Sequence, residues 1–392
     1  MPELKDACYI DGVRIPIGRA KDSGYYARTR ADDMSVRTVR ALMERNPSVP
    51  ADRIDDVAWA ATAQTGDQGL TLGRSIAMLA GLGKEVPGYA IDRMCAGALT
   101  AIVNGANAIR VGAQDLVIAG GVEHMGGHPM GAEVDPNPRF LADKLVDPSA
   151  LVMGNTAENL HDDHPEITRD RTDEFALLSQ ERTAKAIADG VFADHVVPMT
   201  VWSEDGWKVV DTDEHPRPGT TLESLQELSS PFRPGGFVTA GNAAGLNDGA
   251  GGVLLASRAT ADELGLVPRM RVVDYAFVGV EPETMGWGPV PATEKLLAKT
   301  GLTIDDVDVV EMNEAFAVQC VAFLDHFGLP LDSDKVNPYG GAIALGHPLA
   351  FSGARLAMQL ASYFDRHDEA TRGITTMCIG LGMGAAVLWE RC

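Results

Sequence analysis

The chain has 392 residues, of which 45% are hydrophobic, and its formal net charge is −22 at pH 7. This length exceeds what one hydrophobic core usually organises, so we expect two or three core units. A negative charge of this size repels polyanions and argues against a nucleic-acid partner. No apolar run approaches a membrane span, and the stretch MPELKDACYIDG lacks the basic and apolar regions of a secretion signal. We therefore predict a cytoplasmic protein.

The first part of the chain indicates alternating helices and strands. The amphipathic segment 34–45 predicts a helix, and the apolar run 57–63 predicts a buried strand. In the stretch 91–101, IDRMCAGALTA, Cys95 stands just before a run of small residues that reads as a helix start. Taken alone, such a cysteine is more often a buried packing residue than a nucleophile.

The middle of the chain, 122–248, differs in composition and is rich in Asp, Pro and His. It contains one clear predicted helix at 168–190, which Thr168 or Asp170 would cap and Gly190 would end. Long loop-rich insertions are more often functional than idle. We interpret this segment as an inserted loop domain, with a substrate cover as its candidate role.

Two internal repeats indicate a duplication. The letters IDDV occur at 54–57 and 304–307, each after an amphipathic segment and before an apolar run, and the helix-then-strand pattern of 95–121 recurs at 351–382. Repeats in the same order favour a duplicated α/β unit with sheets covered by helices. We predict an N-terminal half at 1–121, completed by about 249–270, and a C-terminal half at 271–392.

Three later stretches place titratable residues in Gly-rich loops at expected strand ends, where α/β sites form. EMNEAFA carries Asn313 and Glu314, GGAIALGHP carries His347, and CIGLGMG begins with Cys378. Each residue has a plainer interpretation: Asn313 and Glu314 could satisfy a helix start, and His347 could bond its own loop. The GLGMG run lacks the frame of a phosphate-binding loop.

Two thiols and an imidazole can together perform acyl transfer. A thiolate attacks, and it is favoured at a helix N-terminus and beside an imidazolium, so Cys95 and His347 could form such a pair. Backbone N–H groups around Gly380 could hold an oxyanion, and Cys378 could move a proton. The cysteines are five, odd in number and scattered, without a C-x-x-C pair, so we predict neither a disulfide framework nor a metal site.

Considered together, these segments resemble the thiolases, a family of acyl-CoA C-acyltransferases. The resemblance covers nearly the whole length in the family's order. It rests on VRIPIG (13–18), CAGAL (95–99), GGVEHM (120–125), MGNTAEN (153–159), DEHPRPGTTLESL (213–225), VTAGNAAGLNDGA (238–250), NEAFA (313–317), GGAIALGHP (340–348) and CIGLGMG (378–384).

The resemblance implies two duplicated α/β halves with mixed sheets in a layered αβαβα arrangement, plus a loop domain that binds coenzyme A. It implies that Cys95 carries the acyl group as a thioester, that His347 takes its proton and that Cys378 is the acid or base at carbon. Backbone N–H groups of Cys95 and Gly380 would hold the acyl oxygen. Asn313, through a water, and His347 would hold the thioester oxygen of the second acetyl-CoA.

Coenzyme A would be a substrate here, with no permanently bound cofactor. Arg217 aligns with the family's adenine-covering arginine, and Met153 and Ala244 lie in matched segments near the pantetheine region. Family members are typically oligomers, so a homodimer or homotetramer is expected.

Several positions depart from the family pattern. Asp92 replaces an Asn, Gly97-Ala98 replace Ser-Gly, and Ala350 and Leu381 replace glycines. Ala244 replaces a serine. We expect all of these changes to crowd or re-line the pocket for the acyl chain and pantetheine, which leaves reaction type intact and substrate preference open.

Four alternatives stay open at this stage. A 3-ketoacyl synthase would place a second histidine where Cys378 stands, and a silent lipid or CoA carrier would lack one of Cys95, His347 and Cys378. A zinc site made of these three residues has no support from their spacing. Within the thiolases, we favour cleavage of 3-ketoacyl-CoA in fatty-acid breakdown, with synthesis of acetoacetyl-CoA as the alternative.

Overall fold

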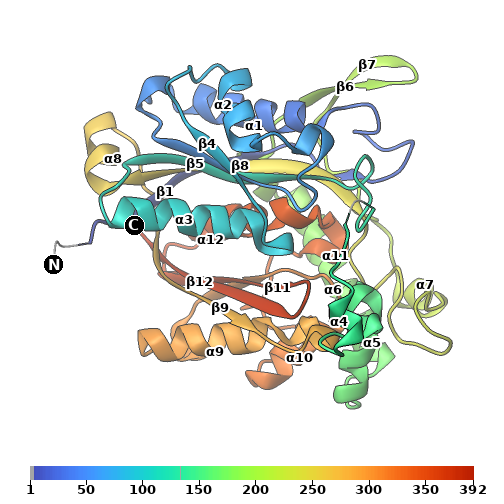
Figure 1. Ribbon diagram of the computed structural model, residues 1–392. Helices are drawn as coiled ribbons and strands as arrows, with labels where there is room; N and C mark the ends of the chain where they lie inside the picture. The colour runs from blue at the N-terminus through green and yellow to red at the C-terminus, as the bar shows by residue number, and fades with distance from the viewer. Residues whose placement is uncertain (1–3, 133) are drawn as a thin grey trace.

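The computed structural model describes residues 4–132 and 134–392. Its core has five layers, helices and sheet strands alternating, as Figure 1 shows. Helices α3 (Gly97–Arg110) and α12 (Ser352–Arg366) form the middle layer. The outer helical layers contain α1 (Ala31–Arg45) and α2 (Leu72–Ala80) on one side, and α9 (Pro289–Thr300) and α10 (Ala317–His326) on the other.

The strands of the two halves repeat one pairing scheme. In the first half, β3 is parallel to β4 and β5, and β5, β8 and β1 are antiparallel neighbours. In the second half, β10 is parallel to β11, and β11, β12 and β9 are antiparallel neighbours. The strand bounds are β1 (Ala7–Arg14), β3 (Asp56–Ala60), β4 (Gly88–Ile91), β5 (Leu116–His124), β8 (Asn247–Ser257), β9 (Met270–Gly279), β10 (Val309–Met312), β11 (Arg372–Ile379) and β12 (Met383–Arg391).

This repetition confirms the duplication predicted from the sequence. The first IDDV copy, 54–57, runs into the start of β3, and the second copy, 304–307, forms the helical turn just before β10. The other repeat forms α3 and β5 in the first half and α12 and β11 in the second. The two halves are also joined edge to edge. Cys8 and Tyr9 of β1 pair with Arg271 and Met270 of β9, so the described strands of both halves form one continuous sheet.

The middle helices approach each other closely because glycine lies at the contact. A Cβ atom on Gly353 would lie 2.6 Å from the backbone N of Leu99. Any larger residue would therefore push α12 away from α3. Most of α12 is buried, as expected of a helix that is covered by a sheet on both sides.

The segment between β5 and β8 gathers at one side of the layers, as both ribbon views show. Its long helix α6 (Arg169–Ala188) begins where Thr168 accepts a hydrogen bond from the Arg171 N–H, and left-handed Gly190 (φ 67°) follows it. These features confirm the predicted helix and its Thr168 cap. The segment also contains α4 (Arg139–Ala142), α5 (Met153–Asp163), β6 (Met199–Ser203), β7 (Gly206–Val210) and α7 (Leu222–Gln226).

The 122–248 domain boundaries stay a prediction. By secondary structure, β5 continues to His124 and β8 starts at Asn247, so a few residues at both ends belong to core strands. The remaining elements are short: β2 (Gly18–Arg19), α8 (Arg258–Leu264) and α11 (Ala342–Leu345).

Candidate active site

Cys95 lies in a single helical turn, Met94–Ala96, directly before α3. The Asp92 carboxylate accepts a hydrogen bond of 2.6 Å from the Met94 N–H, and Met94 has a left-handed φ of 45°. The departure at Asp92 therefore acts in the turn that presents Cys95, and an asparagine oxygen could accept the same bond.

The backbone N–H groups of Gly380 and of Cys95 itself lie close enough to the Cys95 thiol to favour its ionised form and so to lower its pKa. These are the two groups that the family resemblance assigns to the acyl oxygen. Burial nevertheless raises the pKa of Cys95 to about 12. The prediction that a helix N-terminus lowers this pKa is thus wrong for the free protein, because desolvation of the 9% exposed residue outweighs the two N–H donors.

Cys378 lies near the end of β11, fully buried; burial raises its pKa, and Cys95 lies close enough to raise it further. Its S–H donates to Oε1 of Gln319, 3.2 Å away, and the Gln319 amide N donates to the Asn313 carbonyl at 2.9 Å. Gln319 therefore connects the second thiol to the Asn313 segment. Sequence reasoning missed it, although it follows the matched NEAFA segment by only two residues.

His347 and Asn313 form a direct pair. Asn313 Nδ2 lies 3.3 Å from His347 Nε2, and Ser352 Oγ lies 2.6 Å from His347 Nδ1. Burial, followed by the positive charge of Arg355, lowers the pKa of His347 to about 3. The histidine is therefore neutral at pH 7, which corrects the expectation of an imidazolium beside Cys95 and suits a proton acceptor instead.

The loop that carries His347 is fixed by buried polar side chains. Glu314 accepts hydrogen bonds from Ser179 (2.6 Å) and from the Ile343 N–H (3.1 Å). Gly341 is required beside it, because a Cβ there would lie 2.3 Å from the Glu314 carboxyl carbon. Asn247 accepts from the His347 N–H at 3.0 Å. The plainer interpretation of Glu314 as a supporting residue is thus what its contacts show.

Glu123 of β5 connects the first half of the chain to the turn that follows His347 in the second half. Its carboxylate accepts hydrogen bonds from the backbone N–H groups of Thr62 (3.2 Å) and Ala350 (3.1 Å) and from the Gln68 amide (3.2 Å). Burial raises its pKa. Sequence reasoning did not single out this residue, although it lies in the matched GGVEHM segment. A carboxylate inside an otherwise apolar strand was the available signal.

Two of the substitutions relative to the family pattern face each other. Ala350 is buried, and a Cβ on Gly97 would lie 3.2 Å from the Ala350 Cβ. This pair lies in the contact between the Cys95 turn and the Leu349–Phe351 turn that follows His347. The expectation that these positions re-line the substrate pocket stays a prediction. Leu381 lies in the β11–β12 turn with a left-handed φ of 60°, partly exposed.

Arg217 lies on the wall of a cavity of about 330 Å³ in the segment between β5 and β8. Its wall also contains Gln180, Ser224, Leu228 and Gly241. Of the other predicted coenzyme residues, Ala244 donates its N–H to the Ala315 carbonyl at 2.9 Å, beside the NEAFA segment. The Met153 sulfur would lie 3.7 Å from a Cβ on Gly380. These three residues thus extend from an open cavity towards the Cys95 site.

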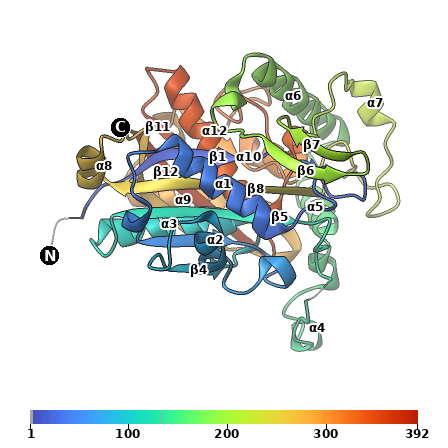
Figure 2. The same cartoon turned by 90° about the horizontal axis from the view of Figure 1, so that it is seen from above.

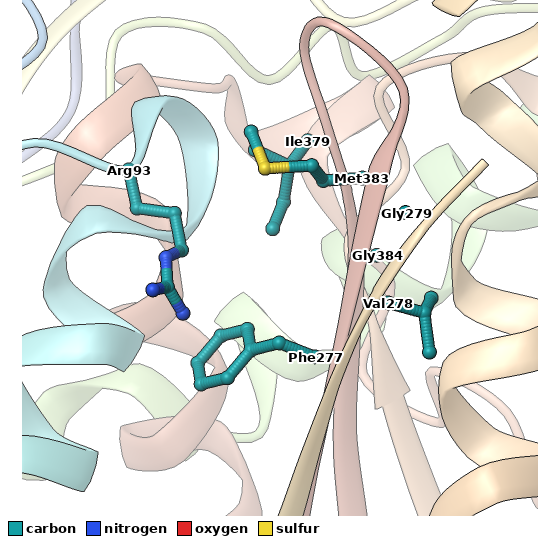
Figure 3. Close-up of a pocket in the computed structure, with 7 residues that line it drawn as sticks. All are labelled: Arg93, Phe277, Val278, Gly279, Ile379, Met383 and Gly384. Atoms are coloured by element: carbon teal, nitrogen blue, oxygen red, sulfur yellow. The ribbon is translucent and has the colours of Figure 1, made fainter. Parts of the chain in front are cut away.

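A second cavity, of about 290 Å³, lies beside the β11–β12 hairpin (Figure 3). Arg93 points into it, with its guanidinium 4.0 Å from the centre of the Phe277 ring. Ile379, Met383 and Gly384 form the opposite wall.

Within residues 4–132 and 134–392, no helix has the length and apolar composition that a bilayer crossing requires. Over the same described ranges, no three acidic, His or Cys side chains are grouped so that they could hold a metal ion.

Comparison with known proteins matches both halves of the chain. The family model of the thiolase N-terminal domain matches residues 8–259, and that of the thiolase C-terminal domain matches residues 266–391. The chain is 44% identical to 3-oxoadipyl-CoA/3-oxo-5,6-dehydrosuberyl-CoA thiolase of Escherichia coli, over 99% of this chain and 100% of that protein. It is also 44% identical to 3-ketoacyl-CoA thiolase of Saccharophagus degradans, over 99% and 98% of the two chains.

Solved structures agree with these matches. The acetyl-CoA acetyltransferase of Bacillus anthracis superposes with a TM-score of 0.89 at 35% identity, over 100% of both chains. Human mitochondrial 3-ketoacyl-CoA thiolase gives the same TM-score and identity over 99% of both chains. With the duplicated fold, the paired thiols and matches over the full length, the chain belongs to the thiolase family of acyltransferases.

Proposed function

We propose that the protein cleaves 3-ketoacyl-CoA with coenzyme A, giving acetyl-CoA and an acyl-CoA shortened by two carbons. The observation that carries this proposal is the environment of Cys95. The backbone N–H groups of Cys95 and Gly380 lie near its sulfur and favour the thiolate, and a second buried thiol, Cys378, lies beside it. A nucleophile, an oxyanion site and a proton donor for carbon are the three groups that such a cleavage needs.

In the first half-reaction, His347 takes the Cys95 proton and the thiolate attacks the 3-keto carbon. The bond between the second and third carbons then breaks, leaving the acyl group on Cys95. Cys378 protonates the departing acetyl-CoA enolate. The Asn313–His347 pair supports this step, because Asn313 Nδ2 and His347 Nε2 are adjacent and can face the thioester oxygen on which enolate charge develops.

In the second half-reaction, the thiol of coenzyme A attacks the acyl-Cys95 thioester. Its proton passes to the Cys378 thiolate, and the protonated His347 returns its proton to the Cys95 sulfur as that sulfur leaves, which restores both thiols and the neutral histidine. The proposed coenzyme site is the cavity beside Arg217, whose planar guanidinium can cover an adenine ring. The overall charge of −22 opposes an anionic ligand, so we expect its phosphate contacts to be weak and salt-sensitive.

The acyl group is the least determined part of the proposal. Relatives of equal identity are named for 3-ketoacyl-CoA and for 3-oxoadipyl-CoA and 3-oxo-5,6-dehydrosuberyl-CoA. We favour straight-chain substrates, in fatty-acid breakdown. Synthesis of acetoacetyl-CoA, the reverse direction, uses the same residues.

A panel of thioesters tests the proposal. CoA-dependent cleavage is measured with 3-ketoacyl-CoA of four to sixteen carbons and with 3-ketoadipyl-CoA, which has a terminal carboxylate. The proposal predicts cleavage of straight-chain members with kcat/KM highest for one length. Activity on 3-ketoadipyl-CoA alone would overturn the substrate assignment, and no cleavage of any member would overturn the reaction itself.

We also propose a cytoplasmic homodimer or homotetramer. The oligomer is supported by β4, which is the last strand in the sheet order and has one edge without a strand partner among the described residues. Light scattering on the purified protein tests it, and a monomeric mass would overturn it.

A further inference from the structure

Arg355 is a fully buried arginine beside the candidate active site, in the first turn of α12. Its Nη2 donates to Asn313 Oδ1 at 3.1 Å, and its Nη1 donates to Gln359. In the described part of the chain, its Nε has no hydrogen-bond partner and no carboxylate forms an ion pair with it. An unpaired charge at this depth costs stability, so its contact with the site calls for an explanation.

The contact fixes the orientation of the Asn313 amide. A guanidinium has only donors and no acceptor. Its partner atom on Asn313 must therefore be the oxygen, which places the NH₂ group on the other side of the amide. That nitrogen lies 3.3 Å from His347 Nε2. Because Nδ2 can only donate, the facing Nε2 must hold a lone pair rather than a hydrogen.

The other side of the histidine ring gives the same answer independently. Ser352 Oγ donates its hydrogen to the Pro348 carbonyl at 3.1 Å. The hydroxyl can then only accept at its 2.6 Å contact with His347 Nδ1. Nδ1 therefore carries the hydrogen and Nε2 the lone pair. These hydrogen bonds form one chain that runs from Arg355 through Asn313, His347 and Ser352 to the Pro348 carbonyl. The guanidinium at one end can only donate and the carbonyl at the other end can only accept, so the direction of every bond between them is fixed.

The charge of Arg355 adds to this directional effect. It is the charged group that, with burial, lowers the pKa of His347. Burial lowers the pKa of Arg355 itself to about 10, so the guanidinium stays charged at pH 7. A neutral histidine with its lone pair on Nε2 is the form that can accept a proton, and the Asn313 N–H must leave that lone pair when the Cys95 proton arrives.

We propose that Arg355 is a positioning residue that sets the amide orientation of Asn313 and, through it, the tautomer and protonation state of His347. The inference rests on the proposed function, since it assigns His347 as the proton acceptor and Asn313 as a donor to the substrate oxygen. A purely structural arginine would support the fold without controlling either property.

Arg355→Met and Arg355→Lys test the proposal by pH profile. Arg355→Met should lower kcat on the order of 10²-fold, the size of losing one preorganised donor, with little change in KM. It should also raise the pKa of His347, so that the acid limb of kcat/KM moves to higher pH. Arg355→Lys keeps the charge but not the planar fork, so kcat should fall while the acid limb stays in place.

A double-mutant cycle with Asn313→Ala separates positioning from support. If Arg355 acts through Asn313, then Arg355→Met or Arg355→Lys causes little further loss of kcat in the Asn313→Ala background. Gln359→Met is the matched control, because it removes the other hydrogen bond of the same guanidinium and keeps the charge; its acid limb should match the wild type. Thermal melts confirm folding, and if Arg355→Met does not fold, the Arg355→Lys cycle decides.

The inference is overturned if the losses of kcat in Arg355→Met and Asn313→Ala add and the acid limb of Arg355→Met does not move. If Arg355→Met does not fold, additive losses of kcat in Arg355→Lys and Asn313→Ala overturn it. Formation of the acyl-enzyme on wild-type Cys95 is measured in parallel. If the wild type does not acylate, the proposed function fails; if it acylates and the losses add, only the role of Arg355 fails.

Discussion

Gly97 and Ala350 meet across the contact between the Cys95 turn and the turn after His347, where a Cβ on Gly97 would lie 3.2 Å from the Ala350 Cβ. The family pattern has a serine at position 97 and a glycine at position 350. In this chain the larger residue of the pair is therefore at 350 instead of 97. The two substitutions therefore compensate each other in volume and keep the distance between the two catalytic turns.

This relationship predicts coupled stabilities. Gly97→Ala should destabilise the protein by about 1–3 kcal/mol, because the new Cβ meets both Ala350 and, at 2.7 Å, the Ala60 Cβ. Adding Ala350→Gly should recover part of that loss, although Ala350→Gly alone is destabilising. Urea unfolding of the four proteins measures the coupling. Strictly additive free energies would show that the two residues do not share one space.

The Cys95 assignment predicts a covalent intermediate. Brief incubation with acetyl-CoA should add an acetyl mass to the peptide that contains Cys95, because nearby backbone N–H groups of Cys95 and Gly380 favour its thiolate. Cys95→Ala should abolish this label and nearly all turnover. The exposed Cys392 provides the control, since Cys392→Ala should label like the wild type. A label that survives Cys95→Ala would contradict the assignment.

Cys378 should separate the two half-reactions. Cys378→Ala should keep acetylation of Cys95 by acetyl-CoA and lose carbon–carbon cleavage by several orders of magnitude, because the variant lacks the proposed proton donor to the enolate. Gln319→Leu should produce a smaller loss of the same kind, since it frees the Cys378 thiol from its 3.2 Å hydrogen bond. Stopped-flow acylation and steady-state cleavage are compared. Equal loss of both steps in Cys378→Ala would argue against a separate acid.

Arg217 should affect binding rather than chemistry. Arg217→Ala should raise KM for coenzyme A about tenfold with kcat nearly unchanged, and added salt should raise KM of the wild type. Arg233→Ala is the matched control: Arg233 pairs with Asp162 at 2.7 Å and does not line the Arg217 cavity. An unchanged KM in Arg217→Ala would place the coenzyme elsewhere.

Glu311 should make the stability depend on pH. It is fully buried, and burial raises its pKa to about 8. The protonated side chain contributes its full share of stability below the ordinary pKa of 4.5, where the folded and unfolded states are both protonated. That contribution is lost as the pH rises from 4.5 through about 8, because the unfolded state ionises first. Glu311→Gln does not titrate, so it should gain a few kcal/mol relative to the wild type between pH 5 and pH 9.

Thermal or urea melts at several pH values measure this difference. The exposed Glu181→Gln is the control, because that side chain is already in water. A constant difference between wild type and Glu311→Gln across the pH range would mean that Glu311 is not protonated in the folded protein.

The sequence was sufficient for the fold class and for the family. Repeats such as IDDV are local patterns, and they mark equivalent strands in both halves. It was not sufficient for electrostatics. A helix start beside Cys95 can be read locally, whereas the desolvation that raises its pKa arises from neighbours distant along the chain.

The same limit applies to the supporting residues. Gln319, Ser352 and Arg355 act through hydrogen bonds to residues 5 to 59 positions away along the chain. Their residue types are common in helices, so composition and periodicity do not distinguish them. Only the packing of α10 and α12 against the ends of β10 and β11 brings them together.

The duplicated architecture also has a consequence for symmetry. The Cys95 turn before α3 and the turn after His347 before α12 occupy equivalent places in the two halves, and they meet at one site. Two identical half-length chains paired in this way would present the same side chain twice. A nucleophile on one side and a proton acceptor on the other require that the two copies differ, and joining them in one polypeptide permits that difference.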